Sequence, residues 1–177
     1  MLPYCRRAIA AGYGVLVLNP NENCDTASGA PIPGSESPED HVLTVWDDLV
    51  AAAPSRALGV VAHSAGGYVT CQLLEERGAA VLPRLRAAAF TDAVLSDAAF
   101  LVAHAVNWVT SDAPMDALLV PAGSHAGLEV RSAGHTNHVW TTFTAEDGVF
   151  AWLAPLLRGA GGGGAGAAGG DGDETMS

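Results

Sequence analysis

A serine with small neighbours stands where a predicted strand turns into a predicted helix. The segment VVAHSAGG places Ser64 directly after an apolar run and before a helical stretch. A turn this sharp needs small residues two positions before and two positions after the serine, here Ala62 and Gly66. The pattern predicts a nucleophile elbow, with the Ala65 backbone N–H directed at a developing oxyanion. The alternative is an ordinary turn in which Ser64 only caps the helix.

Candidate partners for this serine follow later in the chain. A serine becomes a good nucleophile only beside a base that an acid orients. Asp92 ends a predicted strand, and His135 and His138 lie just beyond the last predicted strand. Serine, acid and histidine follow one another in this order in α/β-hydrolases. Spacing does not choose between the two histidines. Asp97 and Asp112 are weaker candidates for the acid, and Asp92 could instead cap a helix.

Other chemistry is disfavoured at these positions. His135 and His138 have no cysteine or acidic partner at metal-ligand spacing, so we expect neither a zinc site nor a cofactor. His63, beside the serine, is expected to shape the turn rather than to act as the base. The remaining histidines are expected at the surface or in helices: His41, His104 and His125.

The elements that must position these side chains follow from the apolar patterns. Short apolar runs predict buried strands at 14–19, 57–62, 86–92, 107–109 and 128–132. Helical spacing and capping residues predict helices at 2–11, from 38 to before Pro54, and at 68–77, 96–105 and 145–157. This alternation predicts an α/β fold, an α/β-hydrolase-like three-layer sandwich with a mostly parallel sheet. We expect one domain over 1–158 and a disordered Gly/Ala-rich acidic tail over 159–177.

Charge and cysteine content restrict the class of partner. The chain has 177 residues and a formal net charge of −11, and its eight basic residues are all arginines. Arg6/Arg7 and Arg84/Arg86 are the only local basic pairs, so direct binding to nucleic acid is not expected. The odd set Cys5, Cys24 and Cys71 predicts reduced thiols in an intracellular protein. Neither a signal peptide nor a membrane-spanning run is apparent.

Several stretches together resemble one protein family. They are LPYCRRAIAAGYGVLVLNPNEN, PEDHVLTVWDD, VVAHSAGG, FTDAV, NWVTSDAP and SAGHTNHVWT. In this order they resemble the argonaute-binding-protein-two family, whose α/β-hydrolase-like domain also ends certain fungal histone deacetylases. The resemblance favours Ser64, Asp92 and His138 as the site residues. It implies a role beside an argonaute or a chromatin regulator, in the nucleus or cytoplasm, with catalysis that is weak or vestigial.

The usual α/β-hydrolase topology has a strand before the helix predicted at 2–11. That strand delivers the loop with the second oxyanion donor and lies between the strands predicted here at 14–19 and 57–62. We therefore expect N-terminal strands to be missing from this chain. Because removing one oxyanion donor costs about 10²–10³ in rate, weak or no hydrolysis is predicted, and a serine esterase is the alternative function.

Overall fold

The computed structural model describes residues 2–95, 104–123 and 127–159. All but the last two residues of the helix predicted at 96–105 lie outside the described residues, and so does the predicted tail from residue 160 onward. No helix in the described ranges is both long and apolar enough to cross a membrane.

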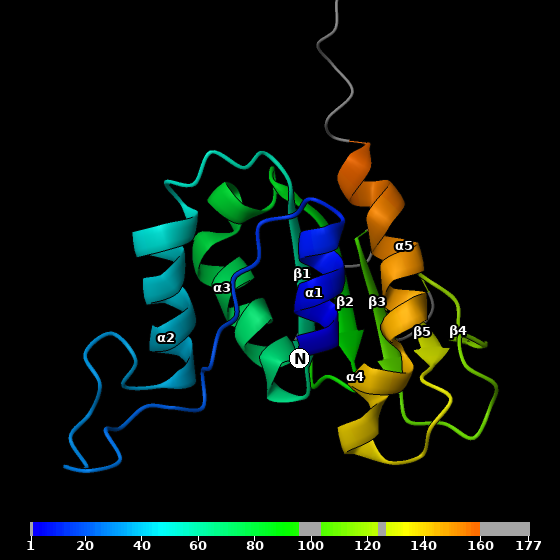
Figure 1. Ribbon diagram of the computed structural model, residues 1–177, viewed down its shortest axis with the longest axis horizontal. Coiled ribbons are helices and arrows are strands. Elements are labelled where there is room, and N and C mark those ends of the chain that lie inside the picture. Colours follow the sequence, from blue (N-terminus) through cyan, green and yellow to red (C-terminus); the bar gives the residue numbers. More distant parts are fainter. Residues whose placement is uncertain (1, 96–103, 124–126, 160–177) are drawn as a thin grey trace, which may run out of the picture.

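A five-stranded sheet forms the centre of the molecule (Figure 1). Its strands run in the order β1 (Leu58–His63), β2 (Leu85–Thr91), β3 (Ala105–Val109), β5 (Glu129–Ser132) and β4 (Leu118–Val120). The first four run parallel to one another, and the edge strand β4 pairs antiparallel with β5. The predicted α/β class with a mostly parallel sheet is therefore confirmed.

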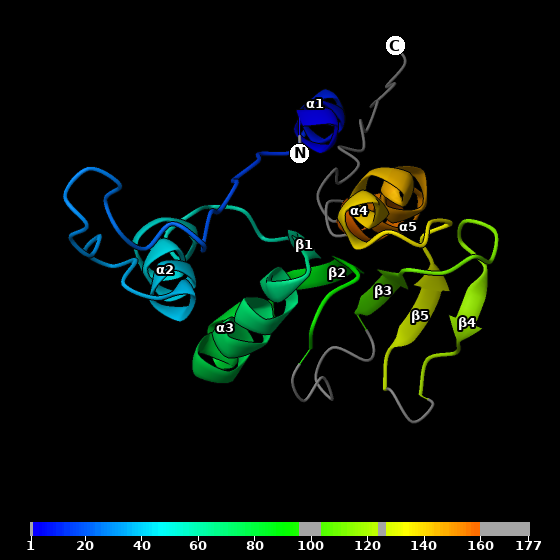
Figure 2. The ribbon, with the colours of Figure 1, turned by 90° about the horizontal axis from the view of Figure 1, so that it is seen from below.

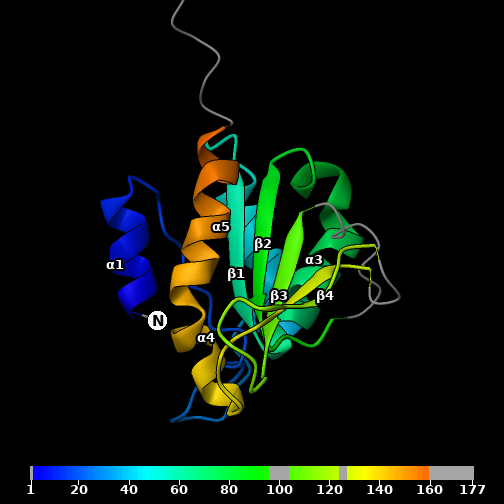
Figure 3. The same ribbon diagram turned by 90° about the vertical axis from the view of Figure 1, so that its right-hand side faces the viewer.

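Helices cover both faces of this sheet (Figure 2). One face carries α2 (Pro38–Val45), which continues as the π-helix η1 (Trp46–Val50), and α3 (Ala65–Val81). The other face carries α4 (Thr141–Thr144) and α5 (Glu146–Arg158), with α1 (Leu2–Ala10) beside α5 (Figure 3). A 3₁₀ turn, η3 (His138–Trp140), leads into α4. The arrangement has three layers, as the strand and helix alternation predicts.

Strand β2 shows why its sequence lacks the apolar–polar alternation of a surface strand. Ala87 and Ala89 pack into the cluster that contains α5, while Ala88 and Phe90 pack into the cluster that contains α3. All four side chains are fully buried. A strand covered by helices on both faces needs apolar side chains at every position. Small alanines let the helices approach closely.

The predicted buried strand at 14–19 is wrong. These residues form no strand, and Val15, Leu16 and Val17 are 41%, 50% and 54% exposed. Within the described residues β1 pairs only with β2, so no neighbouring strand stands beside the 14–19 segment. An apolar run indicates that its side chains favour burial, but a strand also requires a partner for its backbone N–H and C=O groups.

Other boundaries also differ from the sequence-based expectation. Helix α3 (Ala65–Val81) extends beyond both ends of the helix predicted at 68–77 and contains Gly78. A glycine inside a helix costs only about 1 kcal/mol, which packing can offset. The segment just beyond the last predicted strand contains η3, and neither η3 nor the short strand β4 was predicted. Such short elements carry too few residues for a clear periodic pattern.

Candidate functional site

Ser64 occupies the turn between β1 and α3 in a strained backbone conformation. Its φ is 53° and its ψ is −122°, a region that non-glycine residues rarely adopt. Its backbone N–H donates to the carbonyl of Thr91 at the end of β2, at 3.2 Å. This conformation is the sharp strand-to-helix turn that the sequence predicts for an elbow.

Close packing around the turn explains its small residues. A Cβ atom added to Gly66 would lie 3.3 Å from the Cβ of Ala62. A Cβ added to Gly67 would meet both the Cβ of Ala93 and the carbonyl oxygen of Val94 at 2.7 Å. The helix can follow the strand so closely only because these positions lack large side chains.

The Ala65 backbone N–H lies in the first turn of α3. The first N–H groups of a helix have no intrahelical acceptor, and none of the backbone hydrogen bonds found among the described residues uses this one. The positive end of the helix dipole adds to the attraction for an anion at this position. The N–H that the sequence predicts as an oxyanion donor therefore has no acceptor among the described backbone hydrogen bonds.

Asp92 follows β2 and is held by the neighbouring strand. Its Oδ1 accepts hydrogen bonds from the backbone N–H of Thr110 at 3.2 Å and from the Thr110 hydroxyl at 3.4 Å. Its own backbone N–H donates to the carbonyl of Trp108 at 2.7 Å. The side chain is only 18% exposed, and its φ is 50°. These contacts direct Oδ2, the remaining oxygen, away from β3.

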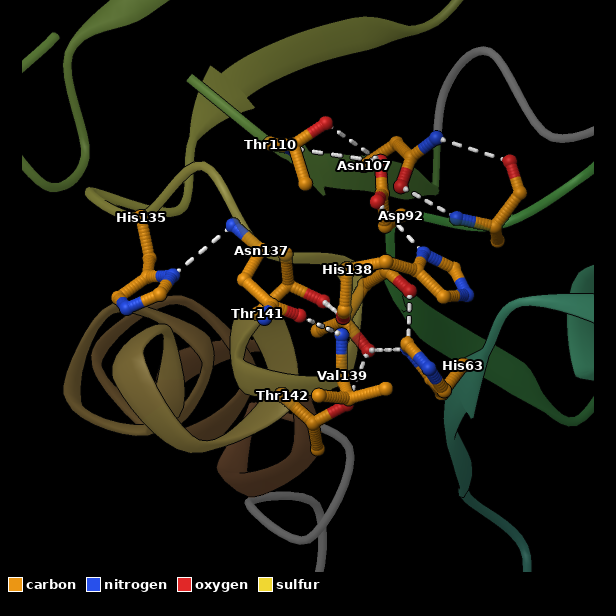
Figure 4. Close-up of polar contacts among 12 residues, drawn as sticks. His63, Asp92, Asn107, Thr110, His135, Asn137, His138, Val139, Thr141 and Thr142 are labelled. Atoms are coloured by element: carbon orange, nitrogen blue, oxygen red, sulfur yellow. Dashed lines mark hydrogen bonds and ion pairs between the residues drawn. The ribbon is translucent and has the colours of Figure 1, made fainter. Parts of the chain in front are cut away.

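That remaining oxygen contacts His138 (Figure 4). The distance from His138 Nδ1 to Asp92 Oδ2 is 2.7 Å. A carboxylate only accepts, so Nδ1 carries the proton and Nε2 is left as the basic nitrogen of the neutral ring. The capping side chain of Asn137, which accepts from the Val139 N–H at 3.1 Å, fixes the turn that presents His138. The structure therefore contains an oriented acid–base pair.

Among the described residues, no hydrogen bond joins Ser64 to the Asp92–His138 pair. No hydrogen bond of the Ser64 hydroxyl appears among the polar contacts of the described residues, whereas its backbone N–H and C=O groups are bonded. His138 is near the elbow, because its ring centroid lies 4.5 Å from that of His63, the residue before Ser64. Hydrogen bonds in sites without substrate are often long and tighten when a ligand binds.

The other candidates lie apart from this pair. His135 accepts a hydrogen bond at Nδ1 from the Asn137 backbone N–H at 2.9 Å, and its ring lies 6.2 Å from that of Trp140. Asp112 is exposed and takes part in none of the ion pairs found among the described residues. Asp97 lies outside the described residues. Of the two histidines that spacing left open, the structure places His138 beside Asp92.

Three further side chains lie around the site, and of these the sequence drew attention only to His63, as a residue expected to shape the turn. His63 Nδ1 lies 2.7 Å from the carbonyl oxygen of Thr91, and the hydroxyls of Thr91 and Thr142 are 2.7 Å apart. Threonine in a strand or helix carries no signal of such a role. His63 was noted because it is adjacent to the serine, whereas nothing in the sequence pointed to Thr91 or Thr142.

Tyr4 of α1 contacts the backbone of Thr142, one of these two threonines. The Tyr4 hydroxyl donates to the Thr142 carbonyl at 2.7 Å. Burial, and secondarily the carboxylate of Glu146, raises the pKa of Tyr4 well above its ordinary value, so this hydroxyl stays neutral and remains a donor. Within the described residues no group of three or more His, Cys, Asp or Glu side chains could hold a metal ion.

Comparison with known proteins adds the family. The profile of the Arb2 domain matches residues 22–115. The "Cotranscriptional regulator ARB2A homolog" of Dictyostelium discoideum is 28% identical over 199 residues, which cover 89% of this chain and 51% of the relative. The "Cotranscriptional regulator ARB2A" of Mus musculus is 25% identical over 216 residues, which cover 86% of this chain and 51% of the relative.

This chain spans about half the length of these relatives, which is 51% in both cases. No solved structure was found to match it. The profile covers more than half of the chain, from the segment before α2 through the elbow and Asp92 to the loop after β3. The chain belongs to the Arb2 domain family.

Proposed function

We propose that this chain is a regulatory domain of the Arb2 type that binds a protein partner in the nucleus. The observation that carries the proposal is its family membership together with relatives named cotranscriptional regulators. The partner we expect is an argonaute or a chromatin regulator in small-RNA-guided silencing or transcript control. With a net charge of −11, the chain would meet nucleic acid through that partner rather than directly.

An exposed apolar cluster beside the acid–base pair supports this proposal. Val139, Trp140 and Phe143 are 69%, 49% and 61% exposed. The rings of Trp140 and Phe143 lie 5.8 Å apart in an edge-to-face arrangement, so they present one surface. Aromatic residues of this kind carry much of the binding energy in protein interfaces.

A capture experiment with the full chain tests the proposal. Tagged wild type, a Trp140→Ala/Phe143→Ala double variant and an Ile9→Ala control are each incubated with nuclear extract. Ile9 is also apolar and is 63% exposed, but it lies on α1. We expect wild type and the control to retain an argonaute or a chromatin regulator, and the double variant to lose at least about ten-fold. Recovery of neither class in replicate would refute the proposal.

A serine hydrolase is the second candidate, and a specific observation favours it: the 2.7 Å contact between Asp92 and His138 near the elbow. In this reaction His138 Nε2 would take the proton of the Ser64 hydroxyl as Oγ bonds to an acyl carbon. The Ala65 N–H would stabilise the oxyanion, and the proton would then pass to the departing alkoxide as its bond to the acyl carbon breaks. Water would hydrolyse the acyl-serine by the same route. A small acyl or lipid ester is the expected substrate class.

We expect such turnover to be weak, because no hydrogen bond is found between Ser64 and His138 and because Ala65 supplies one oxyanion donor. A fluorophosphonate probe tests the candidate through covalent labelling. Wild type should be labelled, Ser64→Ala should not, and Asp92→Asn should react about 10⁴ times more slowly. Equal labelling of wild type and Ser64→Ala, or no labelling of wild type, would dismiss the hydrolase.

A further inference from the structure

His63 is the last residue of β1 and directly precedes Ser64. Its Nδ1 lies 2.7 Å from the main-chain carbonyl of Thr91, its register partner on β2. A carbonyl oxygen only accepts, so Nδ1 of His63 carries a proton in either charge state. The ring is therefore oriented by the edge of the sheet itself, and a simple turn-forming residue would not need this contact.

The hydroxyls of Thr91 and Thr142 extend the contact between His63 and β2. The Thr91 hydroxyl lies 3.3 Å from His63 Nδ1 and 2.7 Å from the hydroxyl of Thr142, and Thr91 is fully buried. The Thr142 carbonyl in turn accepts from Tyr4 at 2.7 Å. A fully buried hydroxyl that is bonded on both sides restricts the ring it touches.

His138 is less restrained on its own. Its side chain is 47% exposed, and among the described polar contacts only Asp92 bonds its ring. One hydrogen bond at Nδ1 leaves the ring free to rotate about that bond. The ring of His63 lies against it, with centroids 4.5 Å apart and planes inclined by 34°, so that His138 lies between Asp92 and His63 (Figure 4).

We propose that His63 is a positioning residue, which supports one face of the His138 imidazole while Asp92 holds its Nδ1. Asp92 fixes one atom of the ring, and the flat face of His63 restricts rotation about that contact. The inference deepens the second proposed function, because a base must be held in position to accept the serine proton.

Histidine NMR of the labelled full chain tests the inference without any catalysis. Replacing His63 with Leu removes the flat face, so the mobility of the His138 ring should increase. Replacing His63 with Phe retains a flat ring and should leave that mobility near the wild-type value. His135→Phe is the matched control, because its ring belongs to the same loop and contacts Trp140 instead.

Unchanged mobility of the His138 ring in His63→Leu would overturn the inference. Equal increases in His63→Leu and His63→Phe would show that the flat ring gives no support, and an equal increase in His135→Phe would show that the effect is not specific to His63. If Ser64 escapes the fluorophosphonate probe while the change in His138 mobility is observed, the hydrolase fails and the positioning role stands.

Discussion

At the scale of single residues, backbone strain gathers at the candidate site. The described non-glycine residues with positive φ are Ser64, Asp92 and Asp116, and the first two belong to the site. Each such conformation costs about 1–3 kcal/mol and persists only where surrounding contacts impose it. For Ser64 those contacts are the hydrogen bonds of its backbone and the close approach of Gly66 to Ala62.

Two substitutions at Ser64 distinguish the effect of backbone strain on stability from the effect of losing the hydroxyl. Ser64→Ala removes the hydroxyl but retains a Cβ atom, whereas Ser64→Gly removes both. Because glycine tolerates φ 53°, we expect Ser64→Gly to be about 1 kcal/mol more stable to unfolding than Ser64→Ala. Urea unfolding followed by circular dichroism measures the difference. A glycine variant that is less stable than the alanine variant would show that this turn is not strained.

At the scale of elements, Arg84 binds backbone carbonyls at the end of η1 and in the segment after it. Arg84 lies before β2, and its guanidinium donates to the carbonyls of Val50, Ala53 and Ser55 at 2.9, 3.1 and 3.0 Å. It also lies 5.5 Å from the ring centroid of Trp46. Val50 ends η1, where carbonyls lack intrahelical partners, and Ala53 and Ser55 lie in the segment that follows. An arginine that belongs to a basic pair in the sequence is thus used within the fold.

Removing this guanidinium should loosen the segment after η1. We expect Arg84→Met to lower the free energy of unfolding by about 2–3 kcal/mol, because it abolishes several charged hydrogen bonds to backbone carbonyls. Thermal or urea denaturation measures the loss. Arg56→Met is the control, since Arg56 is exposed and should change stability by less than about 0.5 kcal/mol. Equal effects of the two substitutions would contradict this role of Arg84.

At the scale of the whole molecule, the first helix is attached to the last one. Helix α1 lies beside α5 (Figure 3), where the rings of Tyr4 and Phe150 are 5.4 Å apart and Arg7 pairs with Asp147 at 2.6 Å. Tyr4 is buried and also bonds the Thr142 carbonyl of α4. Contacts across about 140 residues of sequence therefore hold α1, although the segment after it forms no strand.

High pH should weaken the contribution of Tyr4 to the stability of the fold. The neutral form of Tyr4 is favoured in the folded state, so its folded pKa lies above the unfolded value of about 10. A raised pKa contributes stability that is fully present below the unfolded pKa and is lost as pH rises from about 10 through the folded pKa. Wild type should therefore lose stability above about pH 10 more steeply than Tyr4→Phe.

At neutral pH the same variant should be less stable by about 1 kcal/mol, the value of one hydrogen bond. Urea unfolding of both proteins at neutral pH and above about pH 10 checks both effects. Parallel pH curves for wild type and Tyr4→Phe would show that Tyr4 is not protected from ionisation.

The sequence by itself determined the features that depend on near neighbours. The elbow at Ser64 follows from small residues within a few positions, and the start of α2 follows from Ser37, whose side chain accepts from the Asp40 N–H at 3.0 Å. The buried strand β2 follows from an apolar run of its own, although the similar run at 14–19 forms no strand. Local sterics and capping act within one turn, so a single stretch of sequence contains the whole cause.

Only the tertiary structure decided what depends on distant partners. It placed His138 rather than His135 beside Asp92, because the Asn137-capped turn and the Thr110 contacts bring together residues 46 positions apart. It also left Val15, Leu16 and Val17 outside the sheet, since the described residues give them no neighbouring strand. Pairing across a sheet and between loops requires two segments at once, and neither segment alone encodes the outcome.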